Sequence, residues 1–448
     1  MAEVSKKIIS PDSFSDSSRK ITGILEISPE VVERIKKEIE NISQFEKKIQ
    51  QTSSEKITEV LDIILAGAAV LNASDIHIEP SEKEARLRTR IDGLLQDVTS
   101  LDPIIFQKVL SRIKLLSGLK LNINDRPQDG RFSISIQGNP VEVRASTLPA
   151  EHGESIVLRV LNPKNLITLE VLGLRKDLLT SLNKEIKKPN GMIIVTGPTG
   201  SGKTTTLYAF LSKIKSPENK IITIEDPIEY HLKGISQTQT NPAKGYDFAN
   251  GLKSIMRQDP DVILVGEIRD LETVQIATQA ALTGHLVLTT LHTNDAAGTI
   301  ARLISLGAQA SNIAPALNVA IAQRLVRKIC PKCSKLRKIS KEELSNLKKG
   351  LSNLPKAIKP QLTENTKIPQ AAGCSECNST GFKGRIGIFE AFFVNNEMEK
   401  FISTSPSIAL LKEKAIQQGM VTLKQDGLLR ALQGLTTIEE VERIAGEE

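Results

Sequence analysis

The sequence predicts an α/β fold, in which helices cover both faces of a mainly parallel sheet, preceded by a small α+β domain. Four short apolar runs occur from Gly191 onward: MIIVTG, IITIED, VILVGE and HLVLTTL. Solid runs of this kind are typical of strands that are buried on both faces. Segments with helical periodicity separate these runs, and a glycine-rich loop follows the first of them. A parallel sheet with crossover helices is therefore expected.

The composition is that of a globular protein, and it excludes some classes of function. The chain has 448 residues, enough for two or three domains, and a net charge of +7. Three Tyr, eleven Phe and no Trp argue against binding of single-stranded nucleic acid by base stacking. No apolar run reaches the roughly 18 residues of a membrane span, and the N-terminus lacks the features of a signal peptide. We expect a cytoplasmic protein.

The first part of the chain predicts a tail and a small domain. Residues 1–55 are polar and charged, and one amphipathic stretch around Val31–Ile42 predicts a helix within this tail. Residues 56–165 predict the small α+β domain, in which SDIHIEP and ARLRTRIDG alternate as half-buried strands do. Helices are expected over residues 57–72 and 102–117, and further strands near residues 131–137, 141–146 and 155–160.

The second part, residues 166–448, predicts the α/β domain, after a linker around Asn162–Leu174. Two further segments are expected within it: an insertion over residues 328–380 and a helical tail over residues 395–448. Helices are expected between the apolar runs, at Lys203–Ile214, Phe248–Arg257, Leu271–Leu282 and Ala296–Leu306.

A phosphate-binding loop follows the first apolar run. GPTGSGKT matches the pattern G-x-x-x-x-G-K-[ST] between a predicted strand and a predicted helix, which is the context that the motif requires. Glycines let the backbone curl around phosphate oxygens, and the helix N-terminus adds a favourable dipole. Lys203 would bind the β- and γ-phosphates, and the Thr204 hydroxyl would bind Mg²⁺. The expected nucleotide-binding residues are Gly197, Pro198, Thr199, Gly200, Ser201, Gly202, Lys203, Thr204 and Thr205.

Acidic residues follow two of the apolar strands. Phosphoryl transfer needs a carboxylate near the metal ion and the attacking water. VILVGE offers Glu267, with glycine where many such enzymes carry the magnesium-binding aspartate, so the metal-side acid is expected to be Glu225 or Asp226 of IITIEDPIE. Two histidines flank the apolar strand in GHLVLTTLHTND. We expect His285 to act at the site, and for His292 a functional and a structural role remain open.

The four cysteines form two CxxC pairs separated by 40 residues. In a reducing compartment such pairs favour a metal site over disulfides, and four thiolates suit tetrahedral Zn²⁺. The alternative is four thiols without a metal. The expected ligands of a structural zinc ion are Cys330, Cys333, Cys374 and Cys377.

Taken together and in this order, the motifs resemble the type II secretion and type IV pilus assembly ATPases. From Ser74 onward they include SDIHIEP, RPQDGRFS, RASTLP, HGESIVLRVL, GPTGSGKTTTLY, TIEDPIEY, RQDPDVILVGEIRD and TGHLVLTTLHTND. The resemblance implies an N-terminal α+β domain joined to a RecA-like domain, six subunits in a ring, and nucleotide between the two domains. Family members often carry a larger membrane-docking domain before SDIHIEP. We expect either that the helix near Val31–Ile42 is a reduced version of it or that docking uses another surface.

The resemblance also implies roles for single residues. Glu225 and Asp226 would lie near Mg²⁺ and water, and Glu267 would be catalytic or would organise the metal. His285 lies in the family's His box. Arg144 and Arg159 match arginines that close on the phosphates, with Arg126 and Arg131 as weaker candidates. The tetracysteine insertion is typical of secretion and pilus-extension members and is generally missing from retraction motors. The expected partners are ATP, five further copies of the chain, and a platform protein at the inner face of the cytoplasmic membrane.

Three functions compete at this point. The favoured one is a cytoplasmic hexameric ATPase that powers assembly of a type IV pilus or a type II secretion pseudopilus. The alternative is a hexameric ATPase that translocates nucleic acid, which the basic charge and the cysteine pairs permit and the few aromatics oppose. The third is a nucleotide-binding scaffold without turnover. No stable binding of nucleic acid is expected, and salt-dependent DNA binding would favour the alternative.

Overall fold

The computed structural model describes residues 23–52, 57–136, 139–161 and 168–446. The chain divides into two compact units, Met1–Asn162 and Pro163–Glu448, and each is described by itself. Within the described ranges, every helix is too short or too polar to span a lipid bilayer.

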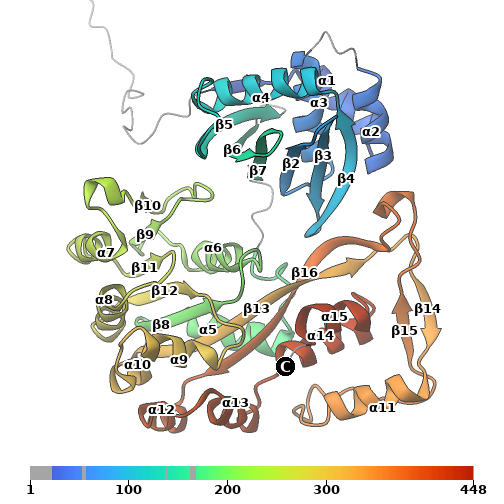
Figure 1. The fold of residues 1–448 in the computed structure, drawn as a ribbon. Helices are drawn as coiled ribbons and strands as arrows, with labels where there is room; N and C mark the ends of the chain where they lie inside the picture. Colours follow the sequence, from blue (N-terminus) through green and yellow to red (C-terminus); the bar gives the residue numbers. More distant parts are fainter. Residues whose placement is uncertain (1–22, 53–56, 137–138, 162–167, 447–448) are drawn as a thin grey trace, which may run out of the picture. The chain divides into compact units, whose positions relative to one another are not determined.

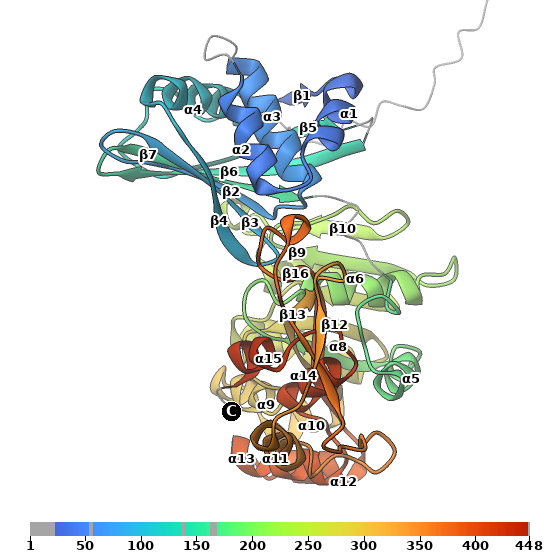
Figure 2. The same ribbon diagram turned by 90° about the vertical axis from the view of Figure 1, so that its right-hand side faces the viewer.

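The first unit is a seven-stranded sheet with helices on one face, as both views show (Figures 1 and 2). The strands lie in the order β1-β5-β6-β7-β2-β3-β4. The strands are β1 (Ile24–Glu26), β2 (Asp75–Pro80), β3 (Ala85–Ile91), β4 (Leu94–Leu101), β5 (Gln128–Ile136), β6 (Asn139–Ala150) and β7 (Gly153–Leu161). The helices are α1 (Pro29–Glu38), α2 (Ile42–Gln50), α3 (Ile57–Val70) and α4 (Pro103–Ser117).

Alternation along the strands decides which face of this sheet is covered. Ile76, Ile78 and Leu87 are fully buried against the helices, whereas the polar residues between them lie on the opposite face. Helix α4 begins where the Asp102 side chain accepts a hydrogen bond from the backbone N–H of Ile104, a typical N-cap. The strands and helices expected between residues 57 and 160 are confirmed, and β4 is an additional strand.

Residues 24–50 belong to this first unit, whereas the sequence predicted a tail with a single helix. Strand β1 pairs in parallel with β5, and the amphipathic stretch is divided between α1 and α2. The break has a local cause, because the Asn41 side chain caps α2 by accepting a hydrogen bond from the backbone N–H of Gln44. Phe45 is fully buried against Gly67 of α3, where a Cβ would stand 2.4 Å from its ring. The N-terminal residues 1–22, which were predicted to lack a signal peptide, lie outside the described ranges.

The second unit contains another seven-stranded sheet, in the order β10-β9-β11-β12-β8-β13-β16. All neighbouring strands are parallel except β13 and β16. The strands are β8 (Gly191–Thr196), β9 (Ile221–Glu225), β10 (Ser236–Gln239), β11 (Val262–Val265), β12 (Leu286–Leu291), β13 (Leu317–Ile329) and β16 (Phe382–Phe393). The four apolar runs are β8, β9, β11 and β12, as predicted, whereas β10, β13 and β16 were not anticipated.

Helices cover both faces of this sheet, which confirms the α/β class. Alternate residues of one strand enter different cores: Ile193 packs with helices α5 and α6, and Ile194 packs with α7 to α10. The predicted bounds of α6 and α8 are confirmed, while α7 ends one residue early and α9 begins two residues late. These helices are α5 (Lys176–Glu185), α6 (Lys203–Ile214), α7 (Phe248–Met256), α8 (Leu271–Leu282), α9 (Gly298–Ser305) and α10 (Ala310–Ala316).

The insertion and the C-terminal helices share a third core in this unit. Leu347 and Ile368 of the insertion pack with Leu428 and Val441 of the last two helices, all of them buried. Figure 1 shows β14, β15 and α11 beside α14 and α15. The insertion contains β14 (Lys335–Lys338), α11 (Lys341–Gly350) and β15 (Lys367–Gln370), and the tail contains α12 (Asn396–Ser403), α13 (Ile408–Gln417), α14 (Leu423–Leu432) and α15 (Ile438–Ala445).

Candidate functional site

The predicted phosphate loop lies between the end of β8 at Thr196 and the start of α6 at Lys203. Gly197 and Gly202 have φ angles of +148° and +89°, a region that favours glycine. A Cβ on Gly197 would stand 2.5 Å from the carbonyl oxygen of Gln323, and a Cβ on Gly202 would stand 2.9 Å from its Nε2. Only glycine therefore lets the loop curl this closely over β13. A glycine-rich turn ahead of a helix N-terminus fits a phosphate group.

Lys203 folds back over this loop. Its Nζ donates hydrogen bonds to the carbonyl oxygens of Gly197, at 2.9 Å, and of Pro198, at 3.2 Å. Burial lowers the pKa of Lys203, while the negative charge of Glu267 opposes that shift. Thr204 is exposed on the first turn of α6. Lys203 and Thr204 thus both stand on the first turn of α6, directly after the glycine-rich loop.

Glu225, at the end of β9, is held in a buried hydrogen-bond cluster. Its side chain accepts hydrogen bonds from the hydroxyls of Thr223, at 2.6 Å, and Tyr208, and from Nε2 of Gln237 at 3.1 Å. Only 3% of Glu225 is exposed, and burial raises its pKa even though these three donors oppose the shift. Asp226, the next residue, is exposed. Of the two acids expected at the metal, Asp226 is therefore the accessible one, and Glu225 anchors the turn that carries it.

Glu267 lies at the carboxyl end of β11, next to two basic side chains. Its carboxylate is 2.5 Å from the guanidinium of Arg269 and 3.6 Å from Nε2 of His292. Burial, followed by the positive charge of Lys203, lowers the pKa of His292, while Glu267 acts in the opposite direction. The neutral form of His292 is thus favoured near neutral pH. Glu267, His292 and Lys203 form one electrostatic cluster beside the phosphate loop.

His285 lies at the other end of the sheet. Strand β12 runs parallel to β8, with Leu286 opposite Gly191 and Leu291 opposite Thr196. The phosphate loop follows Thr196, whereas His285 precedes Leu286 and its Nδ1 lies 3.1 Å from the carbonyl oxygen of Ala280. Six residues of strand span roughly 20 Å. The structure therefore does not bring His285 to the loop, and His292 takes the place that we expected His285 to hold.

The candidate arginines of the first unit form a row across the sheet. Arg131 is opposite Arg144 on β6, Arg144 is opposite Arg159 on β7, and Arg159 is opposite Asp75 on β2. Asp75, which is 6% exposed, accepts a hydrogen bond from Nε of Arg159 at 3.0 Å and lies 3.4 Å from Nε of Arg90. Directly opposite residues point to one face of a sheet. Of the arginines in this row, Asp75 holds Arg159, while Nε of Arg144 lies 3.5 Å from the carboxylate of Glu142.

Arg126, one of the weaker candidates, is exposed on the loop that precedes β5. That loop is anchored from two sides. Nε2 of Gln128 donates a hydrogen bond to the carbonyl oxygen of Ile123 at 2.9 Å, and Nζ of Lys114 donates to the same oxygen at 2.7 Å. Lys114 also pairs with Glu154, and both side chains are almost fully buried. The loop that presents Arg126 is therefore anchored to α4 through Lys114.

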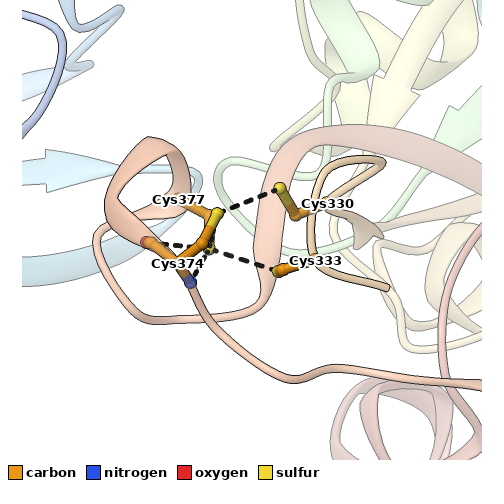
Figure 3. A group of neighbouring side chains, drawn as sticks. All are labelled: Cys330, Cys333, Cys374 and Cys377. Carbon is orange, nitrogen blue, oxygen red and sulfur yellow. Dashed lines mark hydrogen bonds between the residues drawn. The ribbon is translucent and has the colours of Figure 1, made fainter. Parts of the chain in front are cut away.

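The four cysteines converge, as predicted for a metal site. Cys330 and Cys333 face Cys374 and Cys377 across a small space (Figure 3). All four sulfurs lie within 4.8 Å of one another, and three of the separations are 3.7, 3.8 and 3.9 Å. A tetrahedron of Zn–S bonds of about 2.3 Å has edges of about 3.8 Å, so the thiolates fit Zn²⁺ with no open position.

Backbone groups support this cluster. The N–H groups of Cys374 and Gly381 each donate to Sγ of Cys377 at 3.2 Å, and the N–H of Cys330 donates to the carbonyl oxygen of Gly381 at 2.9 Å. Outer contacts of this kind orient metal ligands. The two knuckles are thus held by the β13–β16 pair, so the cluster belongs to the framework of the second unit. A metal ion bound here would link β13 to β16.

The sequence did not single out three residues of this site. Tyr208 holds Glu225, Arg269 pairs with Glu267, and Gln323 lies against both ends of the phosphate loop. Tyr208 follows the glycine-rich motif by four residues, so its position on α6 could have been found from helical spacing. Gln323 belongs to a strand that the sequence did not predict, and no local signal marks it.

Comparison with known proteins identifies relatives of this chain. The family model described as "Type II/IV secretion system protein" matches residues 50–443. The type II secretion system ATPase E of Vibrio cholerae is 41% identical over 410 residues, which cover 91% of this chain and 79% of that protein. The type IV pilus assembly ATPase PilB of Thermus thermophilus is 39% identical over 440 residues, which cover 98% of this chain and 48% of that protein.

Solved structures share the fold. The pilus retraction motor PilT with bound ADP is 28% identical to this chain, with a TM-score of 0.57, and the match covers 86% of this chain and 96% of that one. The ATPase DotB of Legionella pneumophila has a TM-score of 0.61 at 22% identity, over 86% of this chain and 94% of that one. The second likeness supports the fold alone.

Proposed function

Because the chain belongs to the type II/IV secretion system protein family and is an ATP hydrolase, we propose that it powers assembly of a type IV pilus or a type II secretion pseudopilus. The main structural support for an ATP-driven motor is the cluster of Lys203, Glu267 and His292 beside the glycine-rich loop. Such a cluster joins a phosphate-binding cation to a carboxylate that can order water. The tetracysteine cluster favours an assembly motor over a retraction motor.

Each residue of the site has a proposed task. The loop Gly197–Thr205 cradles the triphosphate of ATP, with Lys203 on the phosphates and Thr204 towards Mg²⁺. Glu267 orients the attacking water, and His292 keeps Glu267 in place. Asp226 is the metal-side acid, and Glu225 fixes its position from the buried cluster. Mg²⁺ would supply a Lewis acid that draws charge from the transferred phosphoryl group.

Arg144 and Arg159 are proposed to supply positive charge to the phosphates. Asp75 holds Arg159 by a hydrogen bond of 3.0 Å, and Arg144 lies directly opposite Arg159 in the sheet. A fixed cation stabilises the negative charge that develops in phosphoryl transfer without reorganising at the moment of reaction. The second unit itself would be a RecA-like domain, a proposal that its parallel sheet and phosphate loop support.

We further propose that six copies form a ring at the inner face of the cytoplasmic membrane, where a platform protein of the machine is the partner. The named relatives of the secretion and pilus systems support this. The helices α1 and α2 are not free for docking by their apolar faces, because those faces are buried in the first unit. Docking would use another surface of the chain.

Steady-state phosphate release by the purified chain tests the function. We expect slow ATP turnover that single-stranded DNA does not change and that Lys203→Ala abolishes. Strong stimulation by DNA would instead identify a nucleic-acid translocase. Nucleotide binding with no phosphate release would identify a scaffold, and either outcome would reject the assembly motor.

A further inference from the structure

Both ends of the phosphate loop pack against one residue, Gln323. It lies in the middle of β13, which is adjacent to β8 in the sheet, and 1% of it is exposed. Its backbone carbonyl oxygen stands 2.5 Å from the position of a Cβ on Gly197, and its Nε2 stands 2.9 Å from that of a Cβ on Gly202. One residue thus limits the shape of the loop at its first and its last glycine.

The side chain of Gln323 also holds the helix that follows the loop. The Thr206 hydroxyl donates a hydrogen bond of 2.6 Å to Oε1 of Gln323, and both residues are buried. Thr206 is in the first turn of α6, three residues after Lys203. The Thr206–Gln323 hydrogen bond fixes the first turn of α6 to β13, and the position of Lys203 on that turn therefore depends on it.

The other end of the amide has no partner. Nε2 of Gln323 makes no hydrogen bond with the residues that the structure describes, and it faces Gly202 of the phosphate loop. Packing alone does not explain an amide here, since a methionine would fill a similar volume at no polar cost. The amide N–H faces Gly202, so it could donate a hydrogen bond to the loop once the loop changes shape around a phosphate.

We propose that Gln323 is a positioning residue for nucleotide binding. It braces α6 through Thr206 and limits the shape of the phosphate loop at Gly197 and Gly202. It does not touch the nucleotide and acts through the loop and Lys203. This inference rests on the proposed function, because it assigns a task within the same nucleotide site.

Three variants test it against a purely structural role. Gln323→Met keeps the volume and removes both polar ends, Thr206→Val removes the donor alone, and Gln323→Glu keeps the acceptor for Thr206. Gln425 offers a matched control, because it is a buried glutamine whose Nε2 donates to the carbonyl oxygen of Gly350, at 3.1 Å, away from the loop. The measurements are the Kd of a fluorescent ADP, the KM and kcat for ATP, and the Tm without nucleotide.

We expect Gln323→Met and Thr206→Val each to raise the Kd and KM roughly three- to tenfold, the loss of about one hydrogen bond. The kcat at saturating ATP should fall less, and the double variant should be no worse than either single one. Gln323→Glu keeps the acceptor for Thr206 but places a buried carboxylate under an anion-binding loop, so it should lower the affinity more than Gln323→Met. Gln425→Met should change the Tm alone. A lowered Tm with native Kd and KM in both Gln323→Met and Thr206→Val would overturn the proposal, as would additive effects. Because Kd needs no turnover, a lack of phosphate release by the native chain would reject the function and leave this test intact.

Discussion

Glu267 and Arg269 form an ion pair of 2.5 Å at the carboxyl end of β11. The Arg269 side chain is 66% exposed and that of Glu267 is 14% exposed. A pair with one partner in solvent adds little to stability, so both residues can be substituted without loss of the fold. Glu267 is also within 3.6 Å of His292. The carboxylate is thus restrained from two sides before any nucleotide enters, which suits a group that must be aimed at a water molecule.

Glu267→Gln should stop the chemical step and spare binding. The amide retains the shape of the side chain but cannot accept a proton from water, and a catalytic base is worth about 100- to 10,000-fold in rate. We expect kcat to fall at least about 100-fold, with a nucleotide Kd close to native. Glu272→Gln is the control, since Glu272 is exposed and pairs with Lys253 away from the loop. Normal turnover in Glu267→Gln would remove Glu267 from the mechanism.

His292→Asn and His285→Asn should differ in their effect on turnover. His292 lies beside Glu267, whereas His285 is at the opposite end of β12, so only His292→Asn should lower kcat. Burial lowers the pKa of His292 below its usual value of 6.5, so the neutral ring persists to a more acidic pH. Protonation at still lower pH should cause kcat/KM to fall. A pH–rate profile would show this acid limb in the native chain and its loss in His292→Asn, while an equal loss in His285→Asn would contradict the assignment.

The motifs at strand ends were predictable because their spacing follows from local chemistry. A glycine-rich loop between a strand and a helix has few other uses, so the site at Gly197–Lys203 followed from the sequence. The two histidines could not be separated in this way. Both flank one apolar run, and only the direction of β12 relative to β8 shows that His292 and not His285 lies beside the loop.

Long-range pairing explains what the sequence did not reveal. Gln323 lies beside the phosphate loop because β13 pairs with β8 on one side and with β16 on the other. No local periodicity in the sequence predicts these pairings. Likewise, residues 24–50 looked like part of a tail because most of their side chains are polar or charged. They are ordered because Val32, Ile35 and Phe45 find a core that the later part of the chain provides.

Arg159→Gln should slow turnover more than a matched substitution on the same sheet. Arg159 is held by Asp75, so its guanidinium is pre-positioned, and loss of a fixed cation should lower kcat about 10-fold or more. Arg86→Gln is the control, since Arg86 is 60% exposed on β3 and lies 4.0 Å from Asp97. Asp75→Asn should give an intermediate defect because it leaves Arg159 in place but unrestrained. Equal kcat values in Arg159→Gln and Arg86→Gln would contradict the proposed role.

One zinc ion per chain is expected, and its loss should destabilise the second unit. Cys374→Ser removes a thiolate from the cluster, so elemental analysis should show the zinc content falling from about one to near zero. The Tm should fall by several degrees, since about 1 kcal/mol corresponds to roughly 2–4 °C in a domain of this size. Chelation of the native chain should have the same effect, and Ser379→Ala is a control in the same loop. A native Tm after complete removal of zinc would show that the metal does not support the fold.

The ion pair of Lys114 and Glu154 should matter more for stability than any exposed pair. Both side chains are at most 6% exposed, so removing one partner leaves a buried charge without compensation. Lys114→Met should cost about 3–5 kcal/mol in urea unfolding, because the Ile123 carbonyl also loses a donor. The double variant Lys114→Met with Glu154→Met should recover much of that loss, since an apolar pair of similar volume is often neutral. If the double variant were as unstable as the sum of the single ones, the cost would come from the packing of α4 against β7 and not from the unpaired charge.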